Sequence, residues 1–337
     1  METPSRSICS LESPGMTLWH DVSNFSFIWR YLYVVGLYAA VACAGFAMTT
    51  THAAAQEGSS TVSLPMYEVS DSVKKADDVF WDHLQKKLKS AGINAPVALA
   101  RTDGELVDQW EQKDLLLSQA CGYPYVHTLM DKGVKIVGTP VYATNSDLAP
   151  GEYRSVIVVK ADSPYKSMAD LKGKKAGVND WNSNSGMNLF RATVASSFPE
   201  DALRQGIFSS VTLTDGHLKS IRMIAAGQID VASIDDVSYD LIKRDYPDLA
   251  VQTRILTVTP AAPGLPMITS AQTDDATVRK MRTTIKNLIE HPDDEALRQA
   301  LATMKLTGFL VIDKQDYVQR IHQLEDVARD KDYPTLK

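Results

Sequence analysis

The segment Lys175–Asn188, KAGVNDWNSNSGMN, joins the end of an apolar strand to the start of an amphipathic helix in which Leu189, Ala192 and Ser196 recur at helical spacing. Small hydroxyl and amide side chains occupy residues 182–188, where the helix begins. Several backbone N–H groups lack partners at such a point, and the helix dipole adds about half a positive charge. The segment therefore predicts either an ordinary helix cap or a site for an anion.

A second strand edge also carries polar groups. Residues 215–227, DGHLKSIRMIAAG, predict a helix with Leu218, Ile221 and Ile224 on one face and a glycine as terminator. Residues 228–236, QIDVASIDD, follow as a short buried strand that ends in two carboxylates. Ligands collect at the carboxyl ends of strands in open α/β sheets, so the two edges together favour a ligand site.

From Thr61 onward, apolar strands alternate with helices, which is typical of an α/β fold with parallel sheets and helical crossovers. Residues 71–90 show the clearest apolar helical face. That face is formed by Val73, Ala76, Val79, Phe80, Leu84 and Leu88. Strands are predicted at 62–66, 97–101, 114–118, 134–139, 153–160, 175–178, 211–213, 229–234 and 251–257.

Two segments are typical of crossings between lobes, 145–151 (NSDLAPG) and 259–264 (TPAAPG). If both are hinges, residues 151–255 form an inserted lobe II, and residues 58–150 join residues 256–337 in a discontinuous lobe I. A cleft between two such lobes closes by a hinge motion. Three further helices, predicted at 274–290, 294–304 and 315–329, are most simply packing elements.

The N-terminal 55 residues are predicted to be an export leader. Residues 31–48 form a long apolar run after Arg30, and the small residues 53–55 (AAA) precede Gln56, where the mature chain would start. Lipid attachment at Cys43 and a retained membrane anchor are alternatives. All three place the domain outside the cytoplasmic membrane.

Composition excludes several classes of function. The chain has 337 residues, 44% hydrophobic content and a net charge of −6, which indicates a globular protein and argues against a nucleic-acid partner. Once the leader is removed, Cys121 is the only cysteine, so no internal disulfide forms and a buried structural thiol is expected. The spacings typical of metal, nucleotide or hydrolase sites are absent from the sequence. We therefore predict no metal, no cofactor and no enzymatic activity, although Ser185, His217 and Asp235 are the residue types of a catalytic triad.

The order and spacing of several motifs resemble a known family. The motifs are LPMY at 64–67, LSQACGYP at 117–124, SNSGMN at 183–188, GH at 216–217, GQIDVASID at 227–235 and APGLP at 262–266. Together they resemble the phosphate, phosphite and phosphonate substrate-binding proteins of bacterial ABC importers, over about residues 61 to 320. The resemblance implies a type II periplasmic-binding-protein fold, with two α/β lobes around a hinge cleft.

The resemblance also implies where the ligand binds. Ser183, Asn184 and Ser185 would supply hydroxyl and backbone donors to a tetrahedral oxyanion, and Gly186 would allow a close approach. Threonine is common in the family where this chain has Asn184, so one hydroxyl contact is lost there.

Five further residues complete the predicted site: Tyr67, Ser118, Tyr123, His217 and Asp235. Asp235 would accept a hydrogen bond from a singly protonated anion and reject sulfate, or it would pair with the ammonium group of an aminoalkylphosphonate. Asp236 is expected to cap the following helix.

The implied function is that of an exported, non-enzymatic binding protein, which captures a small phosphorus oxyanion between its lobes and delivers it to the permease of an ABC importer. The alternatives are a periplasmic sensor of another small molecule or anion, and an enzyme on the same fold. A monomer or weak dimer is expected, and the sequence does not rank phosphate, phosphite and phosphonates.

Overall fold

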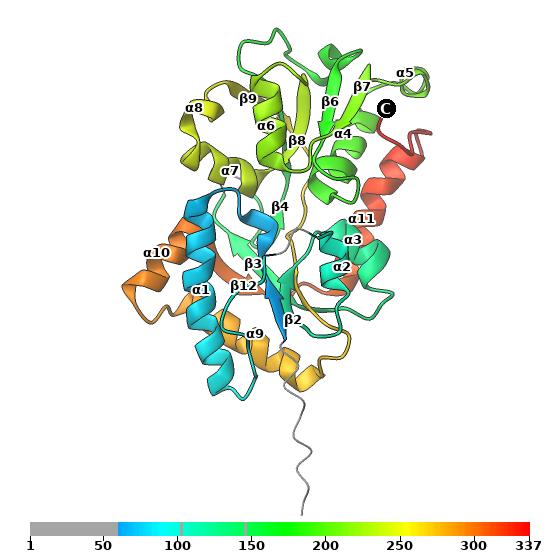
Figure 1. Cartoon of the computed structure of the whole chain (residues 1–337). Helices are drawn as coiled ribbons and strands as arrows, with labels where there is room; N and C mark the ends of the chain where they lie inside the picture. The colour runs from blue at the N-terminus through cyan, green and yellow to red at the C-terminus, as the bar shows by residue number, and fades with distance from the viewer. Residues whose placement is uncertain (1–59, 102–103, 145–146) are drawn as a thin grey trace, which may run out of the picture. The chain divides into compact units, whose positions relative to one another are not determined.

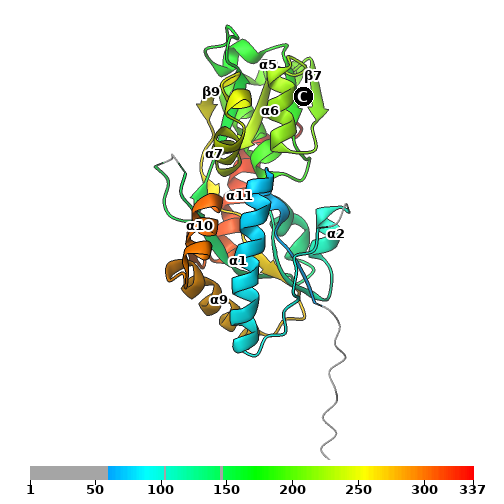
Figure 2. The ribbon, with the colours of Figure 1, turned by 60° about the vertical axis from the view of Figure 1, so that its left-hand side comes forward.

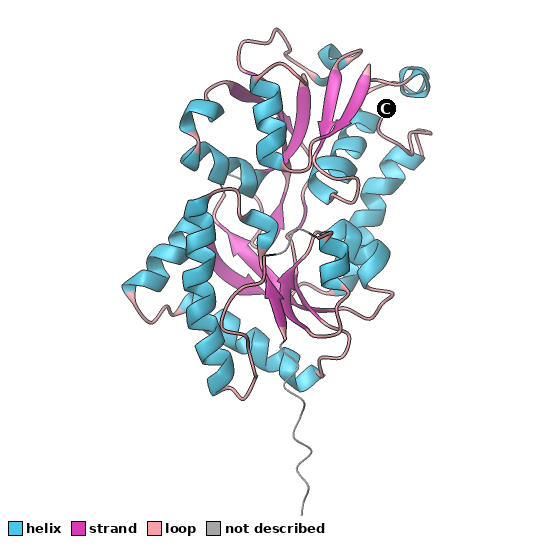
Figure 3. Ribbon diagram, in the orientation of Figure 1, coloured by secondary structure: helices cyan, strands magenta, loops and turns pink. Residues whose placement is uncertain are grey.

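The computed structural model describes residues 60–337 apart from 102–103 and 145–146, and these residues form an α/β fold with helices on both sides of two separate sheets (Figures 1 and 3). The predicted leader, with its apolar run, cleavage site and Cys43, lies outside the described residues. No helix among the described residues has the length and apolar character needed to cross a membrane.

The first sheet is mixed and has the strand order β1-β2-β11-β3-β12. Only β1 and β2 pair in parallel, and the other three pairs are antiparallel. The strands are β1 (Thr61–Ser63), β2 (Leu115–Gln119), β3 (Lys135–Tyr142), β11 (Met267–Thr269) and β12 (Leu306–Leu310). The helices of this region are η1 (Pro65–Tyr67), α1 (Asp71–Ser90), α2 (Leu106–Trp110), α3 (Gly122–Pro124), η2 (Tyr125–Leu129), α9 (Asp275–Glu290), α10 (Glu295–Met304) and α11 (Lys314–Arg329). In Figure 2, α1, α9 and α10 lie side by side.

The second sheet is also mixed, with the order β7-β6-β8-β5-β9, in which β5 runs antiparallel to both of its neighbours. Its strands are β5 (Ser155–Lys160), β6 (Lys175–Val178), β7 (Ser210–Leu213), β8 (Val231–Asp235) and β9 (Thr253–Val258). The helices are η3 (Met168–Leu171), η4 (Asn184–Asn188), α4 (Leu189–Ser197), α5 (Glu200–Gln205), α6 (His217–Ala225), α7 (Asp236–Asp245) and α8 (Pro247–Ala250).

The chain passes between the two sheets near both predicted crossings. There, β4 (Glu152–Tyr153) pairs antiparallel with β10 (Ala262–Pro263), and the Gly264 N–H donates to the Gly151 carbonyl over 2.7 Å. Gly151 has φ +82°, which glycine adopts without strain. The lobe boundaries at 150/151 and 255/256 stay a proposal, and β9 continues in the second sheet to Val258.

The chain passes between the two sheets a third time at helix α11. It packs on the first sheet through Tyr317 and Ile321, whereas Ala328, Tyr333 and Leu336 belong to the apolar cluster of the second sheet. The terminal Lys337 carbonyl accepts from the N–H groups of Ile207 and Phe208. The end of the chain therefore packs with the second sheet.

Local sequence signals explain most element positions. The predicted helix at 71–90 is confirmed, because Ser70 caps it by accepting from the Val73 N–H, and its apolar face is buried apart from the half-buried Val79. The strand predicted at 97–101 is wrong: these residues form a loop in which Val97 is 77% exposed and a single ladder-like bond joins Ala100 N–H to Val62. One such bond does not make a strand.

Candidate anion-binding site

The predicted anion segment lies between β6 and α4 and begins with one wide turn, η4. Ser183 is its N-cap and accepts from the Gly186 N–H over 2.9 Å, while residues 183–188 are all buried. The turn is therefore a true helix cap. It also holds two serine hydroxyls side by side, since Ser183 Oγ and Ser185 Oγ are 3.2 Å apart.

Residues from the second sheet and from β4 fix this turn. Ser155 and Ser233 both donate to the Ser185 carbonyl, over 3.1 and 2.6 Å, and the Asn184 amide donates to the Tyr153 hydroxyl over 2.8 Å. Sequence reasoning missed these supports. The available signal was a serine in each of two mostly apolar strands, β5 and β8, which are neighbours in the sheet.

Gly186 is required by close packing. A Cβ atom at this position would lie 1.6 Å from Asn179 Oδ1, an atom that is buried and has no hydrogen-bond partner. Any side chain at residue 186 would push Asn179 or the turn away. The glycine therefore sets the position of the donors around it.

His217 completes the group on this side. It is the first residue of α6, and its Nε2 lies 3.0 Å from Ser185 Oγ. Burial lowers the pKa of His217 to about 4, so the imidazole is neutral at pH 7. Its Nδ1 is buried and has no partner.

Asp235 contacts Tyr67, which comes from the region of the first sheet. Its carboxylate accepts from the Tyr67 hydroxyl over 3.2 Å and from the Ser238 N–H over 2.9 Å. The second contact makes Asp235 the N-cap of α7, so the expectation that Asp236 caps this helix is wrong. Asp236 is instead the first residue of the helix, because its extended predecessor already provides the capping oxygen.

The adjacent carboxyl groups of Asp235 and Asp236 are both buried, which disfavours their ionised forms. Burial and, next, the neighbouring Asp236 raise the pKa of Asp235 to about 8, and burial also raises the pKa of Asp236. Both Asp236 oxygens are buried without a hydrogen-bond partner. Two adjacent buried carboxylates repel each other when both are ionised, so at pH 7 the pair holds at least one proton.

The residues predicted from the first sheet divide into three cases. Tyr67 reaches the site, with its ring packed edge-on against Tyr142 at 4.8 Å and its pKa raised mainly by burial, so it stays a hydroxyl donor. Ser118 does not offer its hydroxyl, which donates to the Ser63 carbonyl and accepts from Trp110. Tyr123 hydrogen-bonds to Glu325 and Arg191 and belongs to a different cluster.

Cys121 also approaches the turn. Its sulfur accepts from the Asn184 backbone N–H, and burial raises the pKa of the thiol to about 12. A thiol with this pKa is not a nucleophile at neutral pH. The predicted structural role for Cys121 fits this contact.

The geometry does not make a catalytic triad. Ser185 and His217 are within hydrogen-bond distance, but a triad needs a carboxylate on the second imidazole nitrogen. That nitrogen has no partner, and Asp235 bonds to Tyr67 and Ser238 instead. The arrangement is suited to holding a small polar ligand between the two sheets.

Two mixed α/β sheets, joined by three passages of the chain, and polar groups from both regions define the periplasmic-binding-protein class. Two solved structures share the fold. One is a binding protein component of an ABC phosphonate transporter from Pseudomonas aeruginosa (TM-score 0.64, 18% identity, covering 81% of this chain and 87% of that one). The other is PhnD1 from Prochlorococcus marinus in complex with methylphosphonate (TM-score 0.61, 16% identity, covering 82% and 98%). The predicted fold class is confirmed.

The family follows from the sequence comparison. Residues 62–317 match the family described as ABC transporter, phosphonate, periplasmic substrate-binding protein, so the chain belongs to that family of transport solute-binding proteins. A curated relative, the phosphonates-binding periplasmic protein of Escherichia coli K12, is 27% identical over 160 residues. That match spans 46% of this chain and 46% of the relative, which is about half of its length. Membership of the family implies a periplasmic location.

Proposed function

We propose that this protein is the exported binding component of an ABC importer and that it binds a small phosphonate, or the related phosphite or phosphate, at the Ser183, Ser185, His217, Tyr67 and Asp235 group. The observation that carries the proposal is the Tyr67–Asp235 hydrogen bond, which joins the first sheet's region to the second beside the serine pair. Family membership supports the partner, a membrane permease.

The serine and histidine groups offer the anion its donors. Ser185 bonds to Ser183 and to His217, so these two hydroxyls and the imidazole contact one another. An oxyanion would replace these mutual contacts with charge-assisted ones, each worth about 1.5–3 kcal/mol. The positive end of the helix dipole adds to them.

The Asp235 carboxyl group can lie beside an anionic ligand if the two share one proton. A hydrogen bond between this carboxyl group and an oxyanion needs a single proton, which either partner can bring. A phosphonate has a second pKa of about 6 and can bring the proton, whereas sulfate cannot. A protonated Asp235 could donate to sulfate as well, so discrimination against sulfate depends on the ligand bringing the proton. Alternatively, an ionised Asp235 and Asp236 would pair with the ammonium group of an aminoalkylphosphonate.

Ligand entry requires the two regions to separate. Ser183, Ser185 and Asp235 are only 2–3% exposed. Further contacts join the regions: Ser70 donates to Asp245 over 2.5 Å, and Lys305 pairs with Asp240 over 3.0 Å. We infer a hinge opening that breaks the Tyr67–Asp235 bond and re-forms it over the ligand, which is the state that a permease would recognise.

The test is a calorimetric panel with methylphosphonate, 2-aminoethylphosphonate, phosphite, phosphate and sulfate. A ligand at a hundred times its dissociation constant adds about 2.7 kcal/mol to stability, so thermal unfolding provides a second readout. We expect binding of at least one phosphorus anion and weak or no binding of sulfate. If sulfate binds as tightly as every phosphorus anion, or none of the five binds, the proposed ligand class is wrong.

A further inference from the structure

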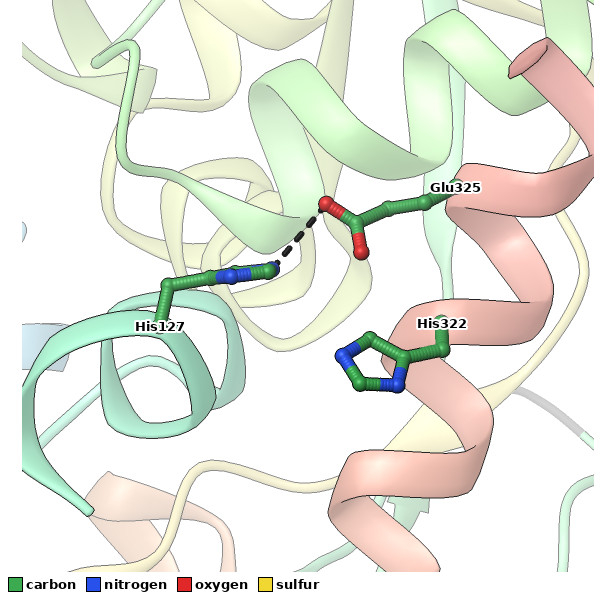
Figure 4. A group of neighbouring side chains, drawn as sticks. All are labelled: His127, His322 and Glu325. Carbon is green, nitrogen blue, oxygen red and sulfur yellow. Dashed lines mark ion pairs between the residues drawn. The ribbon is translucent and has the colours of Figure 1, made fainter. Parts of the chain in front are cut away.

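A second cluster of polar side chains lies away from the anion group, where η2 meets α11 (Figure 4). His127 from η2 faces His322 and Glu325 from α11, and one ligand atom from each residue lies within 4.8 Å of the others. His127 Nε2 is 3.0 Å from Glu325 Oε1, and the two imidazole rings are 5.9 Å apart between centroids. Figure 4 shows the second Glu325 oxygen pointing towards His322.

The residue types and their spacing suit one kind of cation. Two imidazoles and one carboxylate are a typical three-ligand set for Zn²⁺, with a fourth position open to water. Ligand atoms about 2.1 Å from such an ion lie roughly 3.3 Å from one another. The observed separations of 3.0 to 4.8 Å need only a rotation of the exposed His322 side chain. His322 and Glu325 are three residues apart on α11, which puts both on one helix face.

The surroundings hold the carboxylate in place. Arg191 lies 3.9 Å from Glu325 Oε1 and is itself fixed by bonds to the Pro334 carbonyl and to Asn188 Oδ1. Tyr123 bonds to both Glu325 and Arg191, and its ring lies 4.5 Å from that of His127. The guanidinium reduces the attraction for a cation, so we expect micromolar and not nanomolar affinity, but it leaves the second carboxylate oxygen free to turn to the ion.

We propose that His127, His322 and Glu325 bind a divalent transition metal ion of the Zn²⁺ type. Hard cations such as Mg²⁺ prefer all-oxygen ligand sets, and two imidazoles select against them. The bound ion would tie η2 to α11, the helix that packs against both α4 and η4. The proposal depends only on this cluster and would stand if the anion ligand were different.

The test uses the protein purified without a histidine tag from cells that express the full chain, after treatment with a chelator. We expect Zn²⁺ at saturation to raise Tm by roughly 5 °C and Mg²⁺ to leave it unchanged. Replacing Zn²⁺ with Co²⁺ should produce a visible absorption band whose intensity reports four-coordinate geometry. His322→Ala and Glu325→Gln should each weaken Zn²⁺ binding by about 100-fold or more and remove the Co²⁺ band.

The matched control is His291→Ala, which removes an exposed histidine outside the cluster and should change neither readout. Glu325→Gln keeps the shape of the side chain, and metal-free Tm shows whether either variant has lost its fold. Unchanged Zn²⁺ affinity in both folded variants would overturn the proposal, because the ion would then bind elsewhere in the chain. Equal stabilisation by Mg²⁺ would also overturn it.

Discussion

The two proposed binding groups of this molecule both use histidine, but they differ in burial and in the charge of the ligand that they suit. His217 belongs to a buried group, in which its Nε2 contacts the Ser185 hydroxyl and its Nδ1 has no partner, and burial keeps its imidazole neutral. His127 and His322 are exposed and meet one carboxylate from a single side. A buried neutral group with free donors suits an anion, whereas an exposed pair of imidazoles beside a carboxylate suits a cation. Residue type alone would not separate them, because burial decides the difference.

We expect the largest effect from a substitution that shifts the backbone of the buried anion group. Gly186→Ala would put a Cβ 1.6 Å from Asn179 Oδ1, so the turn must shift and the two serine donors move with it. Loss of two charge-assisted bonds predicts a fall in phosphonate affinity of more than about 100-fold, together with ~1–3 kcal/mol of lost stability. Calorimetry and urea unfolding would measure both.

Gly104→Ala is the matched control, because a Cβ at this glycine meets nothing within 4 Å. Zn²⁺ affinity should also survive in Gly186→Ala, since the metal ligands lie on η2 and α11. Normal phosphonate affinity in this variant would show that the turn does not hold the ligand.

Two serines offer the next test, because both are buried and both were predicted to bind the ligand, but the hydroxyl of Ser118 is held by Trp110 and the Ser63 carbonyl. Ser185→Ala removes a hydroxyl from the anion group and should weaken phosphonate binding by about tenfold or more, with ligand-free Tm nearly unchanged. His217→Ala should behave in the same way. Ser118→Ala should do the opposite: it leaves Trp110 Nε1 and the Ser63 carbonyl unpaired, lowering Tm while affinity stays normal.

Titration calorimetry would measure the phosphonate affinity of both serine variants, and thermal unfolding would measure their stability. If Ser185→Ala and His217→Ala bind normally, the anion group is misplaced. If Ser118→Ala weakens binding as strongly as Ser185→Ala, then the hydroxyl of Ser118 does more than join β1 to β2.

The sequence predicted local features better than contacts between distant segments. The helix at 71–90 carries its own cap and a complete apolar face, so its position follows from about twenty residues. Strands β11 and β12 were not predicted, because each is short and is defined by antiparallel pairing with β3, far away in the chain. Val97–Arg101 has strand-like residues but no neighbouring strand to complete a ladder.

The same limit applies to the two sites. Ser183–Gly186 and His217 stand next to recognisable helix starts, so a motif could indicate them. His127 lies almost two hundred residues before His322, and only the packing of η2 against α11 brings them together. The cap at Asp235 was assigned to the adjacent residue, because cap position depends on backbone dihedral angles that two consecutive aspartates do not reveal.

A pH titration of ligand affinity would show which of its two proposed roles Asp235 has in the buried group. At pH above 8, Asp235 loses its proton and a phosphonate has already lost its own, so methylphosphonate affinity should fall by up to about tenfold per pH unit. For 2-aminoethylphosphonate the ionised carboxylate can pair with the ammonium group, and affinity should rise or hold over the same range. Calorimetry from pH 6.5 to 9 with both ligands would distinguish the two roles of Asp235.

The ligand-free protein should show the matching stability trend. The folded state holds a proton that the unfolded chain releases, so the stability contributed by Asp235 is present at low pH and is lost as the pH rises towards 8. Asp235→Asn keeps a hydrogen-bond donor without titrating, so its methylphosphonate affinity should be flat across this range. An equally flat profile in the unmodified protein would mean that Asp235 does not share a proton with the ligand.

The smallest expected effect concerns the connection between the two clusters. Arg191 lies beside Glu325 and donates to Asn188, whose amide donates to Asn184 in the anion turn. A metal ion that turns Glu325 away from Arg191 would therefore disturb the turn slightly, and we expect saturating Zn²⁺ to change phosphonate affinity by no more than about fivefold. Linkage requires phosphonate to change Zn²⁺ affinity by the same factor, which titrations in both orders can check.

Arg191→Lys tests whether this chain of contacts carries the effect. A lysine keeps the positive charge but cannot bond to Asn188, Pro334 and the carboxylate at once, so Zn²⁺ and phosphonate should each still bind while the factor between them approaches one. If the same factor persists in this variant, the coupling travels instead through the packing of α11 on α4 and η4, and the hydrogen-bonded chain is only structural.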